Sequence, residues 1–314
     1  MSIIFGPIKS RRFGESLGVD LSPTTKQCNY DCLYCELNGK RAIDTMTEVL
    51  SVESILNEIE LALKKFSNID SITITANGEP TMYPYLYELM LRLEDIKEDK
   101  KTLLLSNGSL LHDVSVARAC MLFDRVKFSL DAITHNVFKK IDRPHKNISL
   151  DKILAGLYEF WRDYSGELYA EILFVKSIND SVDEVEKMAK FLSPMNLMRL
   201  DIGTIDRPPA YKVEPISFER LEEFSRIFSE YGINVLIPKR SKTSEKLNFS
   251  LSKDEIIKLL SLRPLSEDEV SIRFSKDSMK NLEELRNQGL VKLHENGGIM
   301  FYEVWCICYN AKFY

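Results

Sequence analysis

The sequence predicts an α/β protein that is built on a parallel sheet and carries a small second domain at its C-terminal end. Within residues 1–237, six short β-rich apolar runs alternate with amphipathic runs of helical period. Such alternation is typical of parallel strands that are joined by crossover helices. The expected strands are 17–21, 71–76, 102–106, 126–130, 169–175 and 198–203. The expected helices are 48–65, 84–97, 111–121, 151–163, 180–193 and 217–231.

The run 48–65 shows the helical period most clearly. Its apolar residues recur at steps of three and four and form one stripe, which comprises Val52, Ile55, Leu56, Ile59 and Leu63. The helix expected at 180–193 has a clear start signal, because Asn179, Asp180 and Ser181 can cap it and acidic residues follow in its first turn.

We expect a domain boundary after residue 237. Residues 238–249 begin with proline, are polar and basic, and are typical of a linker. Residues 250–304 carry three helical runs and then two strands around an Asn-Gly-Gly turn, which is a hairpin signal. Three helices followed by a hairpin is the order of a winged helix, and residues 305–314 form a C-terminal tail.

The composition is that of an ordinary globular protein. The 314 residues are 44% hydrophobic and 28% charged, with a formal net charge of -5, so whole-chain electrostatics do not favour nucleic acid. No apolar run approaches the roughly 20 residues that a membrane-spanning helix needs, and the N-terminus becomes basic too soon for a signal peptide. We therefore expect a cytoplasmic protein that has no membrane partner and whose thiols stay reduced.

Three of the six cysteines stand close together in the stretch CNYDCLYC, at Cys28, Cys32 and Cys35. A structural zinc site is disfavoured, because zinc usually takes four ligands and none of the four histidines is near in the sequence. Three ordinary buried cysteines are also disfavoured in so polar a stretch. Three thiolates suit a [4Fe-4S] cluster in which one iron stays open for another ligand.

The C-x3-C-x2-C spacing, with Tyr34 before the last cysteine, resembles the signature of the radical S-adenosylmethionine (SAM) superfamily. That resemblance implies a partial (β/α)6 barrel of the TIM type. It implies that the three cysteines bind a [4Fe-4S] cluster and that SAM chelates the open iron. Reductive cleavage of SAM would yield a 5′-deoxyadenosyl radical that abstracts hydrogen from a substrate. Tyr34 would pack beside the cluster, and a one-electron reductase of flavodoxin or ferredoxin type is an expected partner.

Polar residues at the expected carboxyl ends of the strands resemble further motifs of that superfamily. The stretch NGEPT resembles its Gly-Gly-Glu-Pro motif, with Asn77 in place of the first glycine. Gly78 would allow a close backbone approach, and Glu79 would meet the ammonium of SAM. The other expected SAM contacts are Ser106 and Asn107 in SNGS, Ser129 and Asp131 in SLD, and Glu171. For each, the alternative is a strand-end residue that satisfies local backbone groups.

Several basic residues are candidates for binding the substrate. They are Arg12, Arg143, His145, Lys176 and Arg207. Arginines in such positions could hold an anionic substrate through paired hydrogen bonds. They could equally close surface salt bridges, which contribute little to stability.

Over most of residues 5–237 the chain resembles the branch of the superfamily that is related to wyosine synthases. The stretches that carry this resemblance are GPIKSRRFGESLGVDLSP, CNYDCLYC, RPH and RPPA. This resemblance implies a guanine base of tRNA as the substrate. Two features depart from the branch: no cysteine precedes Cys28 to bind a second cluster, and the flavodoxin-like domain of eukaryotic members has no counterpart. Cys120 lies on an apolar helix face and is expected in the core, while Cys306 and Cys308 are too few for a usual cluster site.

Three functions remain open at this point. The first is a radical SAM enzyme that acts on a tRNA base or another nucleobase-bearing substrate. The second is radical SAM modification of a peptide or protein that docks on the winged helix. Residues 276–295 of that domain carry four basic and four acidic residues, so DNA is not an expected partner. The third is an iron–sulfur redox-sensing regulator, which would leave the NGEPT and SLD motifs unexplained.

Overall fold

The computed structural model of the chain describes residues 3–10, 14–37, 39–66, 68–238, 250–262, 264–296 and 298–305. Arg12, Cys306, Cys308, nearly all of the expected linker and the expected tail after Trp305 lie outside the described residues. The chain divides into two compact units. The first comprises residues 1–33, 40–204 and 214–238, and the second comprises residues 34–39, 205–213 and 239–314.

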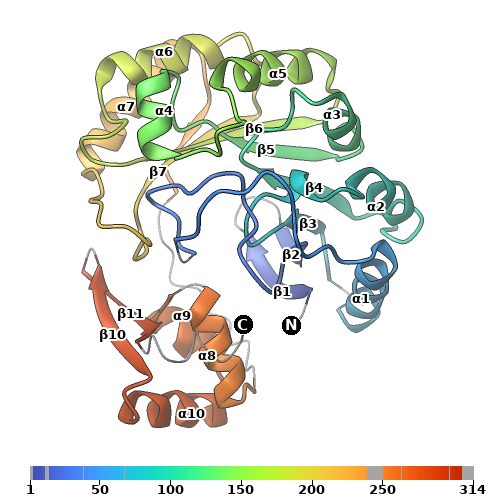
Figure 1. Ribbon diagram of the computed structural model, residues 1–314, viewed down its shortest axis with the longest axis vertical. Helices are drawn as coiled ribbons and strands as arrows, with labels where there is room; N and C mark the ends of the chain where they lie inside the picture. The colour runs from blue at the N-terminus through green and yellow to red at the C-terminus, as the bar shows by residue number, and fades with distance from the viewer. Residues whose placement is uncertain are drawn as a thin grey trace. The chain divides into compact units, whose positions relative to one another are not determined.

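The first unit is built on one eight-stranded sheet whose strands are ordered as in the chain (Figure 1). The strands are β1 (Ile4–Ser10), β2 (Gly14–Asp20), β3 (Ser71–Thr75), β4 (Lys101–Ser106), β5 (Arg125–Ser129), β6 (Glu167–Phe174), β7 (Arg199–Thr204) and β8 (Val235–Leu236). β1 runs antiparallel to β2, and every later pair is parallel. The predicted parallel sheet is confirmed and is consistent with a partial barrel, and the structure adds β1 and β8 at its edges.

Helices connect the successive parallel strands. They are α1 (Val52–Lys65), α2 (Leu86–Leu93), α3 (Val114–Cys120), α4 (His135–Ile141), α5 (Leu150–Asp163), α6 (Val182–Leu192) and α7 (Phe218–Glu230), and a short 3-10 turn spans Pro80–Met82. The predicted start of α6 is confirmed, since the Ser181 hydroxyl accepts a hydrogen bond from the backbone N–H of Glu184. The sequence pattern does not predict α4, because seven residues span only about two turns.

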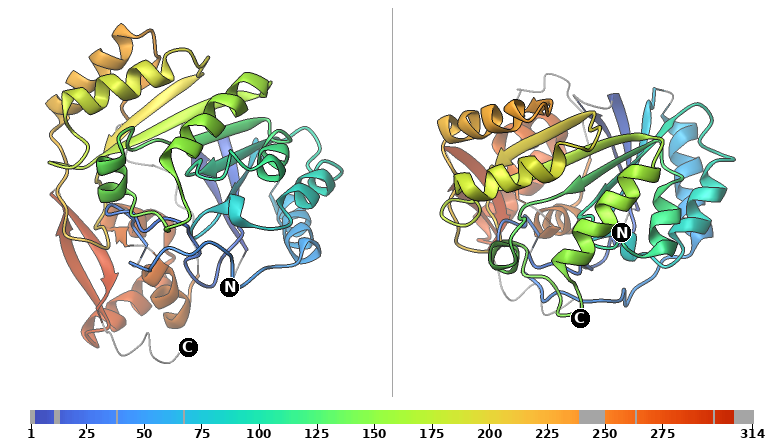
Figure 2. Two further views of the ribbon diagram at one scale, coloured as in Figure 1. Left: turned by 45° about the horizontal axis from the view of Figure 1, so that its top comes forward. Right: turned by 90° about the horizontal axis from the view of Figure 1, so that it is seen from above.

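The two faces of the sheet carry different side chains. One face presents fully buried apolar residues from successive strands, which include Leu17, Ile72, Leu104, Val126 and Leu200. Leu17 packs with Ala62 of α1, and Figures 1 and 2 show the helices on the outer side of the sheet. Because side chains alternate along a strand, residues such as Thr73 and Lys127 point to the opposite face, which combines polar side chains with a small apolar cluster of Leu103, Leu105 and Tyr169.

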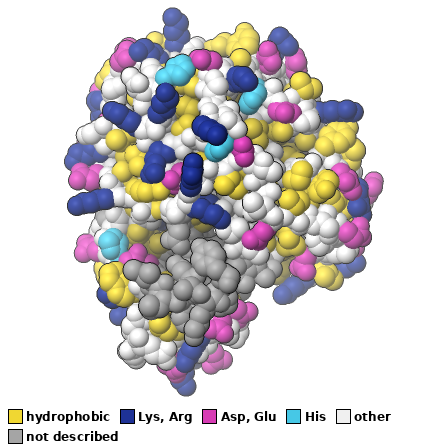
Figure 3. All heavy atoms as spheres, viewed as in Figure 1, with side chains coloured by type: hydrophobic (Ala, Val, Ile, Leu, Met, Phe, Trp, Pro, Cys, Tyr) yellow, Lys and Arg dark blue, Asp and Glu magenta, His cyan; other side chains and the backbone are white. Residues whose placement is uncertain are grey.

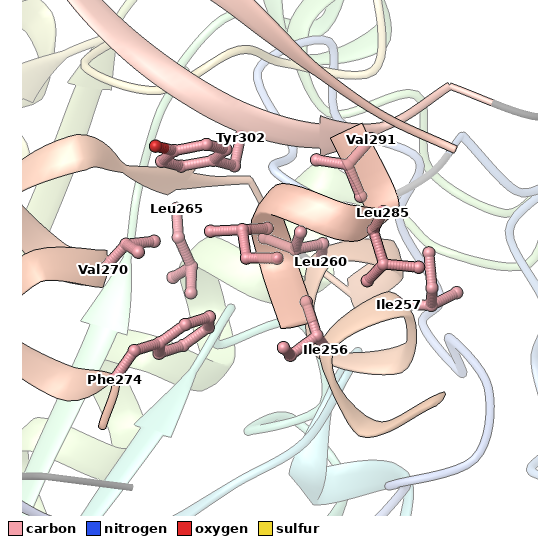
Figure 4. Close-up of a cluster of buried hydrophobic side chains, with 10 residues drawn as sticks. Ile256, Ile257, Leu260, Leu265, Val270, Phe274, Leu285, Val291 and Tyr302 are labelled. Carbon is pink, nitrogen blue, oxygen red and sulfur yellow. The ribbon is translucent and has the colours of Figure 1, made fainter. Parts of the chain in front are cut away.

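The C-terminal part of the second unit has an apolar core of its own (Figure 4). Its elements are α8 (Lys253–Leu262), β9 (Leu265–Ser266), α9 (Glu267–Arg273), α10 (Lys276–Asn287), β10 (Val291–Asn296) and β11 (Ile299–Val304). β11 lies between β10 and β9 in an antiparallel sheet. Buried residues from each helix and strand form the core, among them Ile256, Leu260, Leu265, Val270, Leu285, Val291 and Tyr302. The three predicted helices and the hairpin are confirmed, and β9 is an addition.

The surface of the first unit includes a basic run at the end of α4. Lys139, Lys140, Arg143 and Lys146 are exposed, while the one acidic residue between them, Asp142, is buried. Figure 3 shows several Lys and Arg side chains on the face of the first unit that Figure 1 views. In the parts of the chain that the structure describes, no helix combines the length and the apolar character that a bilayer crossing requires.

Candidate active site

The largely irregular segment that follows β2 carries the cysteines. Cys28, Cys32 and Cys35 are free and partly exposed, and Cys35 falls in the second unit. Cys120 differs from them, since it is fully buried in α3 and burial raises the pKa of its thiol. The prediction that Cys120 is a core residue is confirmed.

Gly78 brings the Asn-Gly-Glu segment directly against the residue that precedes Cys28. The Gln27 N–H donates to the Asn77 carbonyl at 2.8 Å, and the Glu79 N–H donates to the Gln27 carbonyl at 2.9 Å. Gly78 has a φ of 143°, and a Cβ at this position would lie 1.8 Å from the Gln27 carbonyl oxygen. Only glycine fits so close an approach between two backbones.

Asn77, which replaces the usual glycine of the motif, ties the end of β3 to the end of β2. Its backbone N–H donates to Asp20 Oδ1 at 2.9 Å, and its Nδ2 donates to Asp20 Oδ2 at 2.6 Å. Burial raises the pKa of the Asp20 carboxyl, although its hydrogen bonds from Ser22 and Asn77 oppose that shift. The departure from the motif therefore adds a contact that a glycine side chain could not make.

The Glu79 carboxylate is buried and accepts four hydrogen bonds from the protein. Thr81 donates from its N–H at 3.0 Å and its hydroxyl at 2.6 Å, Ser106 donates from its hydroxyl at 2.6 Å, and Asn107 donates from its N–H at 2.6 Å. Burial raises the pKa of Glu79, and these donors counteract part of that shift. The side chain thus joins the end of β4 to the segment after β3.

Asn107 also links the end of β4 to the cysteine loop. Its Nδ2 donates to Asn29 Oδ1 at 2.9 Å and lies 3.9 Å from Cys28 Sγ. Asn29 Nδ2 in turn donates to the Ser109 hydroxyl at 2.7 Å. The carboxyl ends of β2, β3 and β4 therefore meet at the loop that carries Cys28.

Replacing Glu79 with glutamine is expected to lower the free energy of unfolding by about 1–3 kcal/mol. A glutamine amide has one oxygen, so its NH2 group would face donors and leave them without an acceptor, at the usual cost of a broken buried hydrogen bond. Chemical denaturation measures the change. The matched control is Glu214→Gln, which removes an exposed ion pair with Lys176 and is expected to have little effect; equal losses in both variants would contradict the prediction.

Of the expected SAM contacts on β5 and β6, Ser129 ends β5 and Asp131 follows it, whereas Glu171 lies within β6. Ser129 pairs with Glu171 in the register of the two strands. The buried Asp131 accepts a hydrogen bond from the Leu173 N–H at 2.7 Å, and Glu171 lies 2.6 Å from Lys127 Nζ. Asp131 and Glu171 therefore already contact protein groups.

Lys127 is a buried charge that the sequence reasoning missed. Its ammonium lies between Glu171, at 2.6 Å, and the fully buried Asp201, at 2.9 Å. Arg199 is a further neighbour of Asp201, at 2.8 Å. The signal was available, because a lysine within the apolar strand VKFSL of a parallel sheet needs a partner.

The described candidate substrate residues all contact acidic groups of the protein. The pairs are Arg143 with Asp31, His145 with Asp44, Lys176 with Glu214, and Arg207 with Glu36 and Glu269, at distances between 2.7 and 3.8 Å. The salt-bridge alternative is thus the arrangement in this structure. Arg12 lies outside the described residues.

The chemistry of the cysteine loop fits an iron–sulfur cluster. Its three free, partly exposed thiols lie within eight consecutive residues, and thiolates are the usual ligands of such clusters. The Tyr30 N–H and the Asn107 amide lie 3.4 and 3.9 Å from Cys28 Sγ, and contacts of this kind tune clusters. Among the described residues, no group of three or more His, Cys, Asp or Glu side chains is arranged to hold a metal ion, so the fit rests on the donor set.

Comparison with known proteins defines the class. The family description "Radical SAM superfamily" matches residues 22–192. A Helicobacter pylori protein named UPF0026 protein is 44% identical over 301 residues, which is 96% of this chain and 97% of the relative. The UPF0026 protein MJ1312 of Methanocaldococcus jannaschii is 32% identical and covers 96% of both chains. A solved structure described as TYW1 with a lysine-pyruvate adduct bound is 18% identical, with a TM-score of 0.53 over 68% of this chain and 73% of that one.

The chain belongs to the radical SAM superfamily. It is accordingly an enzyme, and membership implies a [4Fe-4S] cluster and SAM. Over 96% of its length the chain is similar to proteins named UPF0026. The TYW1 structure is similar in fold alone. The alternative of a regulator without enzymatic activity is therefore set aside.

Proposed function

We propose that Cys28, Cys32 and Cys35 hold the [4Fe-4S] cluster and that SAM binds beside it, across the carboxyl ends of the strands. The observation that carries this proposal is the meeting of three strand ends at Cys28, through the Gln27–Gly78 bridge and the Asn107–Asn29 hydrogen bond. When bound, the cluster supplies the electron for reductive cleavage of SAM to a radical that abstracts hydrogen from the substrate.

Different residues around the cysteine loop would bind different parts of SAM. Because four protein donors occupy the Glu79 carboxylate, the ammonium of SAM would meet the backbone of this segment rather than that side chain alone. Ser106 and Asn107 place donors beside that segment. Ser129 and Asp131 stand at the end of β5, with Glu171 of β6 opposite Ser129, and hydroxyls of a ribose would find acceptors there. Tyr34, between Cys32 and Cys35, shields the site from water.

The test is anaerobic loading with iron and sulfide, followed by addition of SAM and dithionite. We expect 5′-deoxyadenosine in amounts that depend on SAM and on reductant, quantified by liquid chromatography and mass spectrometry. Protein with a full complement of iron that forms no 5′-deoxyadenosine above the enzyme-free control would refute the proposal. A flavodoxin or ferredoxin is the electron donor that we propose in place of dithionite in the cell.

For the substrate, we propose a tRNA base. The exposed lysines Lys139, Lys140 and Lys146 at and beyond the end of α4 support it, because phosphate contacts dominate affinity for RNA. The sequence resemblance to the wyosine-related branch supports it as well. The absence of any cysteine before Cys28 separates this chain from members with a second cluster.

Profiles of modified nucleosides in tRNA from wild-type and deletion strains test the substrate. We expect at least one modified nucleoside to disappear in the deletion strain and to return when the gene is restored. Identical profiles in the two strains would exclude tRNA.

A peptide or protein substrate is the second candidate, and the C-terminal domain favours it. The order α8, β9, α9, α10 and hairpin supports a winged helix. A hollow of about 410 Å³ lies on it, lined by Glu283, Arg286, Asn287, Val291, Lys292 and Leu293. Its mixed charges suit a peptide better than DNA. Capture with SAM and reductant, followed by mass spectrometry, would show a partner of altered mass, and unaltered partners under turnover would count against it.

A further inference from the structure

The sequence Ile-Asp-Arg-Pro occurs twice, at residues 141–144 and 205–208. The first copy follows α4 and lies in the first unit, and the second follows β7 and lies in the second unit. The sequence left two roles open for both arginines, substrate binding or a salt bridge. The structure places each arginine on an acidic residue that is adjacent to a cysteine of the CNYDCLYCE stretch.

The first copy contacts the loop around Cys32. Arg143 Nη2 lies 3.2 Å from Asp31 Oδ2, and the Asp31 side chain is only 7% exposed. The Asp31 and Leu33 N–H groups donate to the carbonyls of Asp142 and Ile141, at 3.0 and 2.8 Å. Arg143 adopts a φ of +46°, which is uncommon for a residue with a side chain and tends to persist where surroundings impose it.

The second copy and the residues that follow it contact the loop around Cys35. Arg207 Nε lies 3.5 Å from Glu36 Oε1, and Arg207 Nη2 lies 2.7 Å from Glu269 Oε1 in α9. The Ala210 N–H donates to the Cys35 carbonyl at 2.9 Å. The Arg207 side chain is 17% exposed, so most of it is withdrawn from solvent.

We propose that Arg143 and Arg207 are positioning residues that fix the cysteine loop through Asp31 and Glu36, an arrangement that we call the clasp. Each arginine pairs with a carboxylate next to a cysteine, where thiolate ligands would add further negative charge, and at Asp31 it does so together with Lys26, whose Nζ lies 3.7 Å from Asp31 Oδ1. Each segment also fixes the loop backbone by hydrogen bonds. The inference rests on the proposed function for the role of the loop, but the clasp itself is a property of the chain without any cofactor.

Amide hydrogen exchange of the cluster-free protein tests the clasp directly. In Arg143→Ala, the amides of Asp31 and Leu33 are expected to exchange about tenfold faster, since they lose a charge-assisted restraint on their segment. In Arg207→Ala, the Ala210 amide is expected to respond in the same way. Arg143→Lys keeps the charge and should fold, and it is expected to show a smaller change in the same direction.

The matched control is Arg220→Ala on α7. Arg220 pairs with Glu223 at 2.6 Å and is far from the cysteines in the sequence. Its side chain is 32% exposed, which is close to the 39% of Arg143. The proposal would be overturned if the amides of Asp31, Leu33 and Ala210 exchange at the same rates in the Arg143 and Arg207 variants as in the control. If the wild-type protein takes up no cluster, the proposed function fails, while the exchange experiment still judges the clasp.

The loaded protein provides the second readout. Iron release to a chelator is expected to be about tenfold faster in Arg143→Ala and Arg207→Ala than in Arg220→Ala, with a change in the electron paramagnetic resonance line shape of the reduced cluster. If the wild-type protein loads normally but the two variants match the control in release rate and line shape, the clasp is refuted and the proposed function still stands.

Discussion

Replacing any one of Cys28, Cys32 and Cys35 with alanine is expected to abolish stable cluster binding and, with it, the cleavage of SAM. Three thiolates leave one iron open, and loss of a further ligand leaves a second iron without a protein ligand. No cysteine adjacent to this stretch can take its place. Iron and sulfide content, visible absorption and 5′-deoxyadenosine formation measure the effect.

The matched control for the cysteine variants is Cys120→Ala. Cys120 is fully buried and lies in α3, so its replacement is expected to reduce stability modestly and to leave the iron content unchanged. A loop variant that retains full iron and sulfide, or a Cys120 variant that loses them, would show that the cluster is held elsewhere.

Replacing Gly78 with alanine is expected to lower the free energy of unfolding by about 3 kcal/mol and to reduce cluster loading sharply. The new methyl group would collide with the Gln27 carbonyl, and the backbone conformation at a φ of 143° is one that residues with side chains rarely adopt. Relief of the collision must move Gln27, which is covalently joined to Cys28. Thermal unfolding and iron content report the two effects separately.

Gly203→Ala is the control for this prediction, because Gly203 lies in β7 and an added methyl group there would have no neighbouring atom within 4 Å. It is expected to unfold like the wild type and to load normally. A Gly78→Ala protein with wild-type stability and loading would show that the two backbones can separate without consequence.

Most elements of the fold follow from local patterns in the sequence. The six central strands and their helices have strong periodicity, and the C-terminal hairpin has a clear turn signal. The sequence pattern does not predict β1, because IFGPIKS mixes glycine, proline and basic residues with apolar ones. It does not predict β8 either, because two residues are too few to show a period. Both are edge strands, whose existence depends on a neighbouring strand with free hydrogen-bonding groups.

The candidate site divides in the same way. Cys28, Cys32 and Cys35 and the NGEPT and SNGS stretches can be found by spacing and residue type, since their chemistry is local to a few residues. The partners of Arg143 and Arg207 cannot, because Asp31 and Glu36 lie more than a hundred residues away in the sequence. The local sequence around an arginine that precedes a proline is the same whether the side chain contacts substrate, solvent or a distant carboxylate.

By itself the sequence determined the parallel sheet and the small C-terminal domain and carried the resemblance to the radical SAM superfamily, because apolar periodicity and thiol spacing are properties of neighbouring residues. The tertiary structure decided which charges meet. In the structure, Arg143 and Arg207 contact acidic residues of the cysteine loop. The Glu79 carboxylate accepts hydrogen bonds from four protein donors. Lys127 is buried between Glu171 and Asp201. Pairing of charges depends on how the chain closes on itself, and only packing brings such distant groups within hydrogen-bonding reach.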